Sequence, residues 1–175
     1  GTMTFHGGFA PTPAPVAGTI QVTADSTINS DQTGANAADI WLLSTLSGTN
    51  NLTVNMLAPG VNNVILFGTN TAYSGNWTNA NGGIITEGST TNALGSGSVI
   101  LQVADAFLGF NSTNNLVVGN GIYGNGSVIK WNTGTVALNG TNTFTGSLIV
   151  SNGVLQIGNG NAVSTAGTIS ILSGA

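Results

Sequence analysis

The stretch LNGTNTFTGSLIVSNGVLQIGNG, residues 138–160, decides the fold that we expect for this chain. Its apolar residues occur at every second position, in short runs separated by Gly and Asn. Such alternation between turn-forming residues is typical of β-strands with one buried face. The stretch contains no charged residue, no Cys and no His, so it offers little that could carry out chemistry. We therefore expect it to have a structural role.

The same pattern continues along the chain from Thr19 onward. Short runs such as TIQV, LTVNML, GSVILQV, SVIKW and TISIL alternate with turns rich in Gly, Asn, Ser and Thr. Runs of this kind predict strands. No window of helical length has a sustained apolar face, so the chain is predicted to be all-β.

Two long segments of the chain resemble each other, residues 67–101 and residues 139–172. The degenerate repeats that contain them run from about 42 to 101 and from about 116 to 172. A repeat of this length is too long for one coil of a β-solenoid, so each should contain about three coils of roughly 20–25 residues.

Stacked coils explain the unusual composition of the repeats. Strands of neighbouring coils lie about 4.8 Å apart, and every second side chain points into the core. In the opening stretch we expect Leu148, Val150, Leu155 and Ile157 to point inward. Asn and Gly suit the corners because they tolerate positive φ, and stacked Asn side chains are expected to form ladders between coils.

The segment GTNTFTGSLIVSNGVLQIGNGNAV resembles the autotransporter-associated β-strand repeat, also called the passenger-associated (PATR-type) repeat. The resemblance implies a right-handed parallel β-helix in a secreted or surface-displayed bacterial protein, and it implies no catalytic residues. The matching positions are Gly140, Asn142, Thr143, Phe144, Thr145, Gly146, Val150, Gly153, Leu155, Gln156, Ile157 and Gly158.

The predicted fold is therefore all-β, a right-handed parallel β-helix of roughly seven to eight coils over residues 18–175. Residues 1–17 differ from the rest, because the run PTPAP places three Pro in five residues. Such a run favours an extended, polyproline II-like conformation. We expect residues 1–17 to form an extended N-terminal arm.

The charge content excludes several kinds of partner. Only 3% of the residues are charged, and Lys130 is the one basic residue apart from a single His. Binding of nucleic acid or of anionic membrane surfaces requires clusters of Lys and Arg, so neither is expected. No apolar run approaches the roughly 20 residues of a membrane helix, and without Cys no disulfide can form. We expect no cofactor.

Carboxylates are the best candidates for catalysis, although we expect that the protein is not an enzyme. Parallel β-helix enzymes that act on carbohydrates use clustered carboxylates, and Asp25, Asp31, Asp39 and Asp105 are the candidates here. No Arg or His accompanies them, and Asp is common at turns. His6 has no second His nearby, so no metal site is predicted.

Aromatic residues offer a second alternative, in which the chain is an autotransporter-type passenger fragment that binds glycans as an adhesin. This hypothesis requires Trp77 and Trp131 to be exposed on one flank, whereas core packing of the aromatics is the competing interpretation. The candidate aromatics are Trp41, Trp77, Trp131, Tyr73, Tyr123 and Phe144. Five Asn-x-Ser/Thr sequons are candidate glycosylation sites, at Asn51, Asn76, Asn111, Asn125 and Asn139.

The ends of the solenoid support the preferred hypothesis, a structural subunit of an extracellular surface fibre or matrix. The C-terminal residues GTISILSGA continue the strand pattern without a polar cap, and an uncapped coil offers unpaired backbone groups to another chain. Copies of the chain would then stack head to tail. The arm residues Phe5, Phe9 and Val16 are expected to dock on the C-terminal edge of a neighbour, at Ile169, Ile171 and Leu172.

Overall fold

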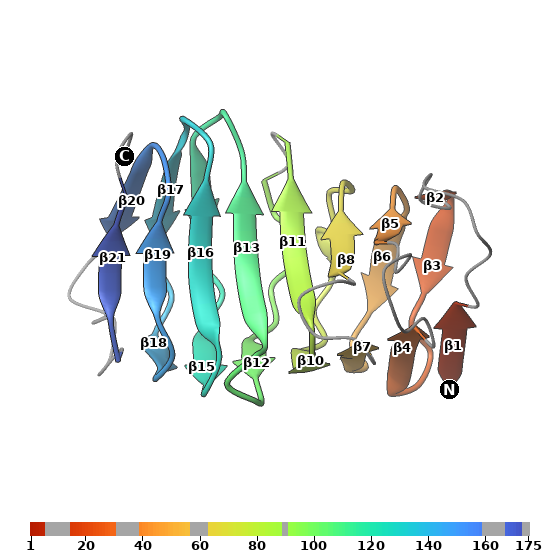
Figure 1. Ribbon diagram of the computed structural model, residues 1–175. Coiled ribbons are helices and arrows are strands. Elements are labelled where there is room, and N and C mark those ends of the chain that lie inside the picture. The colour runs from red at the N-terminus through yellow and green to blue at the C-terminus, as the bar shows by residue number, and fades with distance from the viewer. Residues whose placement is uncertain (6–14, 31–38, 57–62, 89–90, 159–166, 173–175) are drawn as a thin grey trace.

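The computed structural model describes residues 1–5, 15–30, 39–56, 63–88, 91–158 and 167–172. Over these residues the protein is a β-solenoid built from parallel strands, and they contain no helix (Figure 1). Two long sheets run the whole length of the solenoid, and two shorter sheets share its third side.

Sheet A and sheet B form two sides of every coil. In order along sheet A, the strands are β1 (Thr2–Phe5), β4 (Ser26–Ser30), β7 (Leu52–Met56), β10 (Trp77–Asn81), β12 (Val99–Leu101), β15 (Ile122–Gly124) and β18 (Asn142–Phe144). Along sheet B they are β2 (Pro15–Val16), β5 (Ile40–Leu42), β8 (Asn63–Leu66), β11 (Gly83–Glu87), β13 (Phe107–Asn111), β16 (Ser127–Trp131), β19 (Leu148–Val150) and β21 (Ile169–Ile171).

The third side changes along the solenoid. Sheet C serves the N-terminal half and contains β3 (Thr19–Gln21), β6 (Thr45–Gly48) and β9 (Ala72–Tyr73). Sheet D serves the C-terminal half and contains β14 (Leu116–Val118), β17 (Thr135–Leu138) and β20 (Val154–Ile157). The turn at 91–95 lies in the chain between these two sheets.

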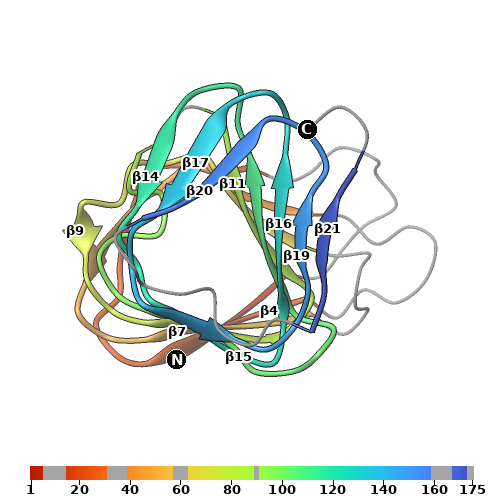
Figure 2. The ribbon, with the colours of Figure 1, turned by 90° about the vertical axis from the view of Figure 1, so that its left-hand side faces the viewer.

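The solenoid is right-handed. With the C-terminal end toward the viewer, the chain runs from β15 through β16 to β17 in a counterclockwise direction as it advances (Figure 2). Ser26 lies opposite Leu52, 26 residues later, and Thr135 lies opposite Val154, 19 residues later, so a coil takes 19 to 26 residues. The predicted right-handed parallel β-helix is confirmed. Its seven strands in sheet A enclose about six complete turns, close to the coil number that we expected.

The described parts of residues 1–17 belong to the first coil. β1 pairs with β4, and β2 pairs with β5, both in parallel. Val16 is half-buried and packs against the core of its own chain. Phe9 lies outside the described residues, as does the rest of the segment 6–14, so the expected extended arm stays a prediction for that segment.

The inward side chains stack from coil to coil as the alternation predicts. Leu148 and Val150 are buried, and Leu155 is half-buried against the core. Ile157, which we also expected inside, is 39% exposed. Its register partner on the preceding coil, Leu138, is fully buried. Ile157 is exposed because β20 is the last described strand of sheet D, so no described strand of a following coil pairs with it.

Glycines of the repeat allow successive coils to approach each other closely. A Cβ atom added to Gly146 would lie 2.3 Å from the carbonyl oxygen of Gly126, one coil away. Gly153 has a φ of 75°, a conformation that L side chains rarely adopt. The coils therefore approach closely at these corners because glycine has no side chain.

Candidate functional site

Carboxylates and asparagines of successive coils form hydrogen-bonded ladders at the corners. The Asn51 N–H donates to Asp25 Oδ1 over 2.7 Å, and Asn51 Nδ2 donates to Asp25 Oδ2 over 3.4 Å. Asn51 Oδ1 accepts the Asn76 N–H over 3.0 Å, and Asn76 Oδ1 accepts the Ser98 N–H over 2.9 Å. Each amide thus joins neighbouring coils, which confirms the expected asparagine ladders.

Two further ladders also begin at a carboxylate. The N–H and Nδ2 of Asn63 donate to Asp39 Oδ1 over 2.9 and 2.8 Å. Asn111 Nδ2 donates to both carboxylate oxygens of Glu87 over 3.1 and 2.9 Å, and Asn111 Oδ1 accepts from Asn132 Nδ2 over 3.0 Å. An ionised carboxylate only accepts hydrogen bonds, so it suits the coil at which a ladder begins.

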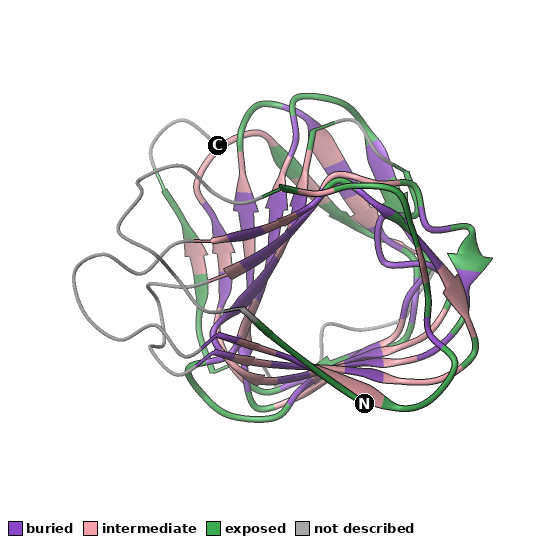
Figure 3. Ribbon diagram, turned by 90° about the vertical axis from the view of Figure 1, so that its right-hand side faces the viewer, coloured by how far each residue is buried: buried purple, intermediate pink, exposed green. Residues whose placement is uncertain are grey.

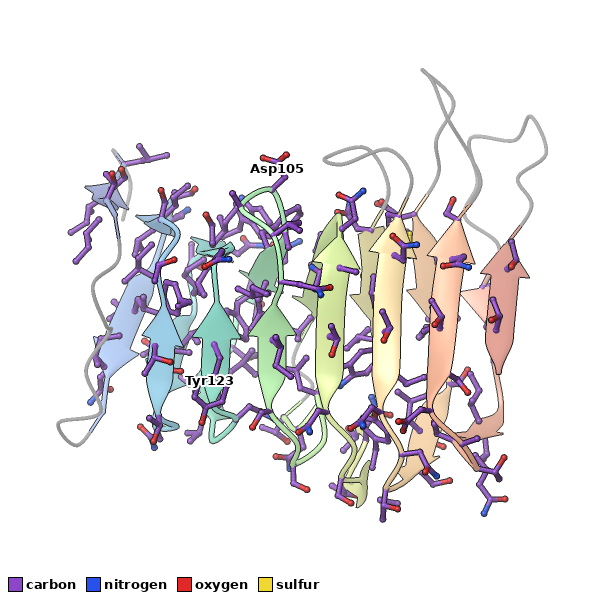
Figure 4. The ribbon with its side chains drawn as sticks, turned by 90° about the horizontal axis from the view of Figure 1, so that it is seen from below. Asp105 and Tyr123 are labelled. Carbon is purple, nitrogen blue, oxygen red and sulfur yellow. The ribbon has the colours of Figure 1, made fainter. Side chains whose placement is uncertain are left out.

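The described aspartates do not converge into one catalytic cluster. Asp25 precedes β4 of sheet A, and Asp39 precedes β5 of sheet B. Asp105 is exposed on the loop that follows β12 (Figure 4). Asp31 and His6 lie outside the described residues. Within the described ranges, no group of three or more His, Cys, Asp or Glu residues could hold a metal ion.

Lys130 points into the core, where its ammonium group is held by backbone carbonyls. Its side chain is fully buried, because it follows Val128 on the inward face of β16. Nζ donates to the carbonyl oxygen of Trp131, to that of Asn132 over 2.5 Å and to that of Asn152 over 3.4 Å. Burial lowers the pKa of Lys130 below its usual value. The one Lys of the chain is therefore a buried hydrogen-bond donor to backbone carbonyls and is not available to a ligand on the surface.

The candidate aromatics do not form a single stripe. Trp77 is fully buried, with its Nε1 donating to the Leu94 carbonyl oxygen over 3.0 Å. Tyr73 packs edge-on against it at 5.6 Å between ring centroids, and burial raises the pKa of Tyr73 above its usual range. Phe144 is also fully buried. The expectation that an adhesin would expose Trp77 is therefore wrong.

The remaining aromatics lie on the outer surface, on two different sheets. Tyr123 lies on the outer face of β15 in sheet A (Figure 4). Trp131 lies on the outer side of β16 in sheet B, edge-on to Phe107 with ring centroids 6.1 Å apart. Trp41 is half-buried on β5 of the same sheet and packs against Phe67 at 5.0 Å. Sheet B therefore carries the aromatic face.

An open groove crosses this outer face of sheet B, with a volume of about 530 Å³. We call it the sheet B groove. It combines apolar side chains with carboxylates and amides, and the lining residues are Asp39, Ile65, Ile85, Glu87, Asn111, Trp131 and Asn132. The ladders described above supply its polar groups, because Asp39, Glu87 and Asn132 are all ladder members.

The sequons fall into two groups. Asn51, Asn76 and Asn111 use their side chains in the ladders between coils. Asn125 and Asn139 are exposed. Attachment of a glycan requires an accessible Asn side chain, so Asn125 and Asn139 are the better placed of the five. Glycosylation stays a prediction.

The N-terminal end of the solenoid faces the viewer in Figure 3. An apolar cavity of about 210 Å³ lies at this end. Strands β1, β2 and β3 are the first strands of sheets A, B and C, so their outer edges have no strand partner among the described residues. The cavity lies behind these strands, and its apolar lining includes Met3, Ile20, Val22, Ile28, Leu42, Leu46 and Leu52.

The C-terminal end exposes large apolar side chains on its last strands. Strands β20 and β21 are the last described strands of sheets D and B. Ile169 is 63% exposed and Ile171 is 72% exposed on β21, and Leu172 follows them at 51%. Val154 and Ile157 of β20 are exposed as well. The C-terminal edge residues that we predicted from the sequence thus lie at the open end.

Two features of these sites were missed at the sequence level. The inward position of Lys130 was signalled by alternation in SVIKW, where Val128 and Lys130 share a face. The sheet B groove had no local signal, because Asp39 and Asn132 are brought to one surface only by the stacking of coils.

A comparison with known families finds one match in the chain. Residues 128–157 match the family model described as the passenger-associated-transport-repeat. Neither the curated proteins nor the solved structures give a match to this chain. Among the described residues no helix is long and apolar enough to span a membrane.

The repeat and the solenoid together fit an autotransporter-associated β-helix repeat protein, as the sequence resemblance implied. They suggest a β-helix of the autotransporter passenger type, with a structural or adhesive role rather than an enzymatic one. The repeat family implies a secreted or surface-exposed protein.

Proposed function

We propose that this protein is an extracellular structural β-solenoid whose copies associate end to end into a surface fibre or matrix. The observation that carries the proposal is the C-terminal end, where β20 and β21 expose a set of large apolar side chains next to a sheet edge that has no strand partner among the described residues. A protein that remains a monomer covers or charges such an edge.

The N-terminal end is complementary to this surface. It combines an apolar cavity with the outer edges of β1 and β2, which pair with no further strand in the part of the chain that the structure describes. All strands of sheets A and B run parallel, so β18 and β21 of one copy face β1 and β2 of the next copy with the same strand direction. The contact is heterologous, and repetition of a heterologous contact builds an open filament.

The distribution of charge favours the same contact. No charged side chain precedes Asp25 in the sequence, and none follows Lys130. Charged side chains on edge strands are a common protection against unwanted pairing between sheets. Both ends of this solenoid lack that protection, so stacking would bury no unpaired charged side chain.

The structure favours one form of assembly over another. We expected residues of the N-terminal arm to leave their own body and dock on a neighbour. β1 and β2 instead pair with strands of their own chain, and Val16 packs on its own core. We therefore propose that the first coil stays in place and offers its outer edge to the neighbouring copy.

Sedimentation velocity of the 175-residue chain over a range of concentrations tests the proposal, together with negative-stain electron microscopy. We expect concentration-dependent association and filaments. The variants I171K and M3K place a charge at the C-terminal and N-terminal ends, and each should abolish association. The matched control is V117K, because Val117 is 59% exposed on β14, away from both ends. Monomers of the unmodified chain at every concentration would overturn the proposal.

A further inference from the structure

The sheet B groove has the dimensions of a site for an extended ligand. It reaches from Asp39, beside β5, to Asn132, beside β16. These strands are four positions apart in sheet B, a distance of about 19 Å at about 4.8 Å for each strand. Sites for small molecules enclose most of the ligand surface. An open groove of this length instead suits a chain that lies along the solenoid.

The floor of the groove is an apolar platform that ends in an indole ring. Ile65 and Ile85 are register partners on β8 and β11 and point outward. A Cβ atom on Gly109 would lie 2.2 Å from the Trp131 ring, so the indole lies across β13 where this strand has no side chain. Phe107 packs edge-on against the ring, with 6.1 Å between the ring centroids. The ring is thus held before any ligand arrives.

The rim of the groove carries planar hydrogen-bonding groups. Asp39 uses Oδ1 for both hydrogen bonds from Asn63, and Oδ2 has no partner among the described residues. Asn132 is exposed, and its amide donates to Asn111 through Nδ2 while retaining an acceptor oxygen. Carboxylates and amides of this kind bind pairs of neighbouring hydroxyl groups, which both donate and accept.

The negative charge of the groove favours neutral over anionic ligands among those that carry hydroxyl groups. Its lining includes Asp39 and Glu87 and no cation. The one Lys of the chain is buried on the inner side of the sheet. An anionic polysaccharide or a nucleic acid would therefore meet repulsion with no compensating contact.

We propose that the sheet B groove binds a neutral polysaccharide chain, whose sugar rings stack on Trp131 and whose hydroxyl groups bind Asp39 and Asn132. An aromatic ring with a polar rim matches a ligand that is apolar on its ring faces and polar at its edges. The groove lies on the side of the solenoid, so this inference is independent of stacking through the ends.

Isothermal titration of the 175-residue chain with neutral hexasaccharides tests the proposal. The probes are the hexamers of β-1,4-glucose, α-1,4-glucose, β-1,4-mannose and β-1,4-N-acetylglucosamine, with hexagalacturonate as the anionic comparison. We expect at least one neutral hexamer to bind with a Kd below about 5 mM, and its monomer and hexagalacturonate to bind at least about tenfold more weakly.

Variants then locate the site. W131A should weaken binding by at least about tenfold, and N132G by about threefold or more; glycine keeps the positive φ that Asn132 adopts. The matched control Y123A removes an outer-face aromatic from sheet A and should bind as the parent does. If W131A does not fold, N132G decides alone. Failure of all four neutral probes, tighter binding of hexagalacturonate, or an equal loss in Y123A would overturn the proposal.

Discussion

Replacing Lys130 by methionine tests whether a buried ammonium group stabilises this solenoid. Nζ makes two close hydrogen bonds, to the carbonyl oxygens of Trp131 and Asn132, and a third over 3.4 Å to that of Asn152. A hydrogen bond with a charged partner contributes about 1.5–3 kcal/mol. The low end of this range applies because burial of the charge opposes it. The two close bonds then contribute about 3 kcal/mol in total.

Methionine keeps the unbranched stem in the core, so K130M should lose about 3 kcal/mol of unfolding free energy. K130A also loses three buried methylene groups, at about 0.8 kcal/mol each, and should lose about 5 kcal/mol. Urea unfolding followed by far-UV circular dichroism measures both values. An equal or greater stability of K130M at pH 7 would refute the reasoning, because the cost of burying the ammonium would then exceed the gain from its bonds.

The pH dependence provides a second test of the same residue. Burial lowers the pKa of Lys130 from the usual 10.5. Between the lowered pKa and 10.5 the unfolded chain binds more protons than the folded chain, so stability rises with pH in this window. Below the folded pKa both states carry the proton, so Lys130 adds no further pH dependence there. The parent protein should therefore gain stability as the pH rises toward 10.5, whereas K130M should show no such gain.

Three further changes test the ladders, the core and the corners by urea unfolding. N51A removes the acceptor of the Asn76 N–H and should cost about 1 kcal/mol; N51D keeps that acceptor but sets a carboxylate beside Asp25, and its destabilisation should diminish in about 0.5 M salt. F144A empties a fully buried site and should cost about 3–5 kcal/mol, against less than about 1.5 kcal/mol for F144L. G146A forces a methyl group against the Gly126 carbonyl and should cost about 1–3 kcal/mol. The control G119A, which meets nothing within 4 Å, should stay within about 0.5 kcal/mol of the parent. A loss in G119A equal to that in G146A would contradict the account of close coil packing.

The alternation of apolar and polar residues predicted the strands of the coils well, because successive side chains of a strand point to opposite faces of the sheet. It placed Leu148 and Val150 inside, and the resemblance of the surrounding segment to the autotransporter-associated repeat implied the right-handed parallel β-helix that the structure has. Alternation does not report whether another coil covers a side chain, so Ile157 at the open end was expected to be buried and is exposed.

The candidate sites could not be predicted from single segments, because their side chains come together only when the coils stack. Trp77 was a candidate for the surface, yet it is the first residue of β10 and points into the core. The core can hold an indole at this position because the Leu94 carbonyl oxygen accepts a hydrogen bond from its N–H. The sheet B groove joins side chains from coils far apart in the sequence. Its prediction requires the number of residues in every coil between β5 and β16, and these lengths vary from 20 to 24.

The burial of Lys130 has a consequence for survival outside the cell. Trypsin-like proteases cleave after Lys or Arg, and this chain contains one such residue and no other. That residue lies at full burial on a strand between β13 and β19. Cleavage requires the backbone to leave the sheet and enter the protease, which costs most in strands at the centre of a core. Trypsin therefore has no accessible peptide bond in the folded protein, and the rate of digestion reports how often the solenoid opens at the coil that contains β16.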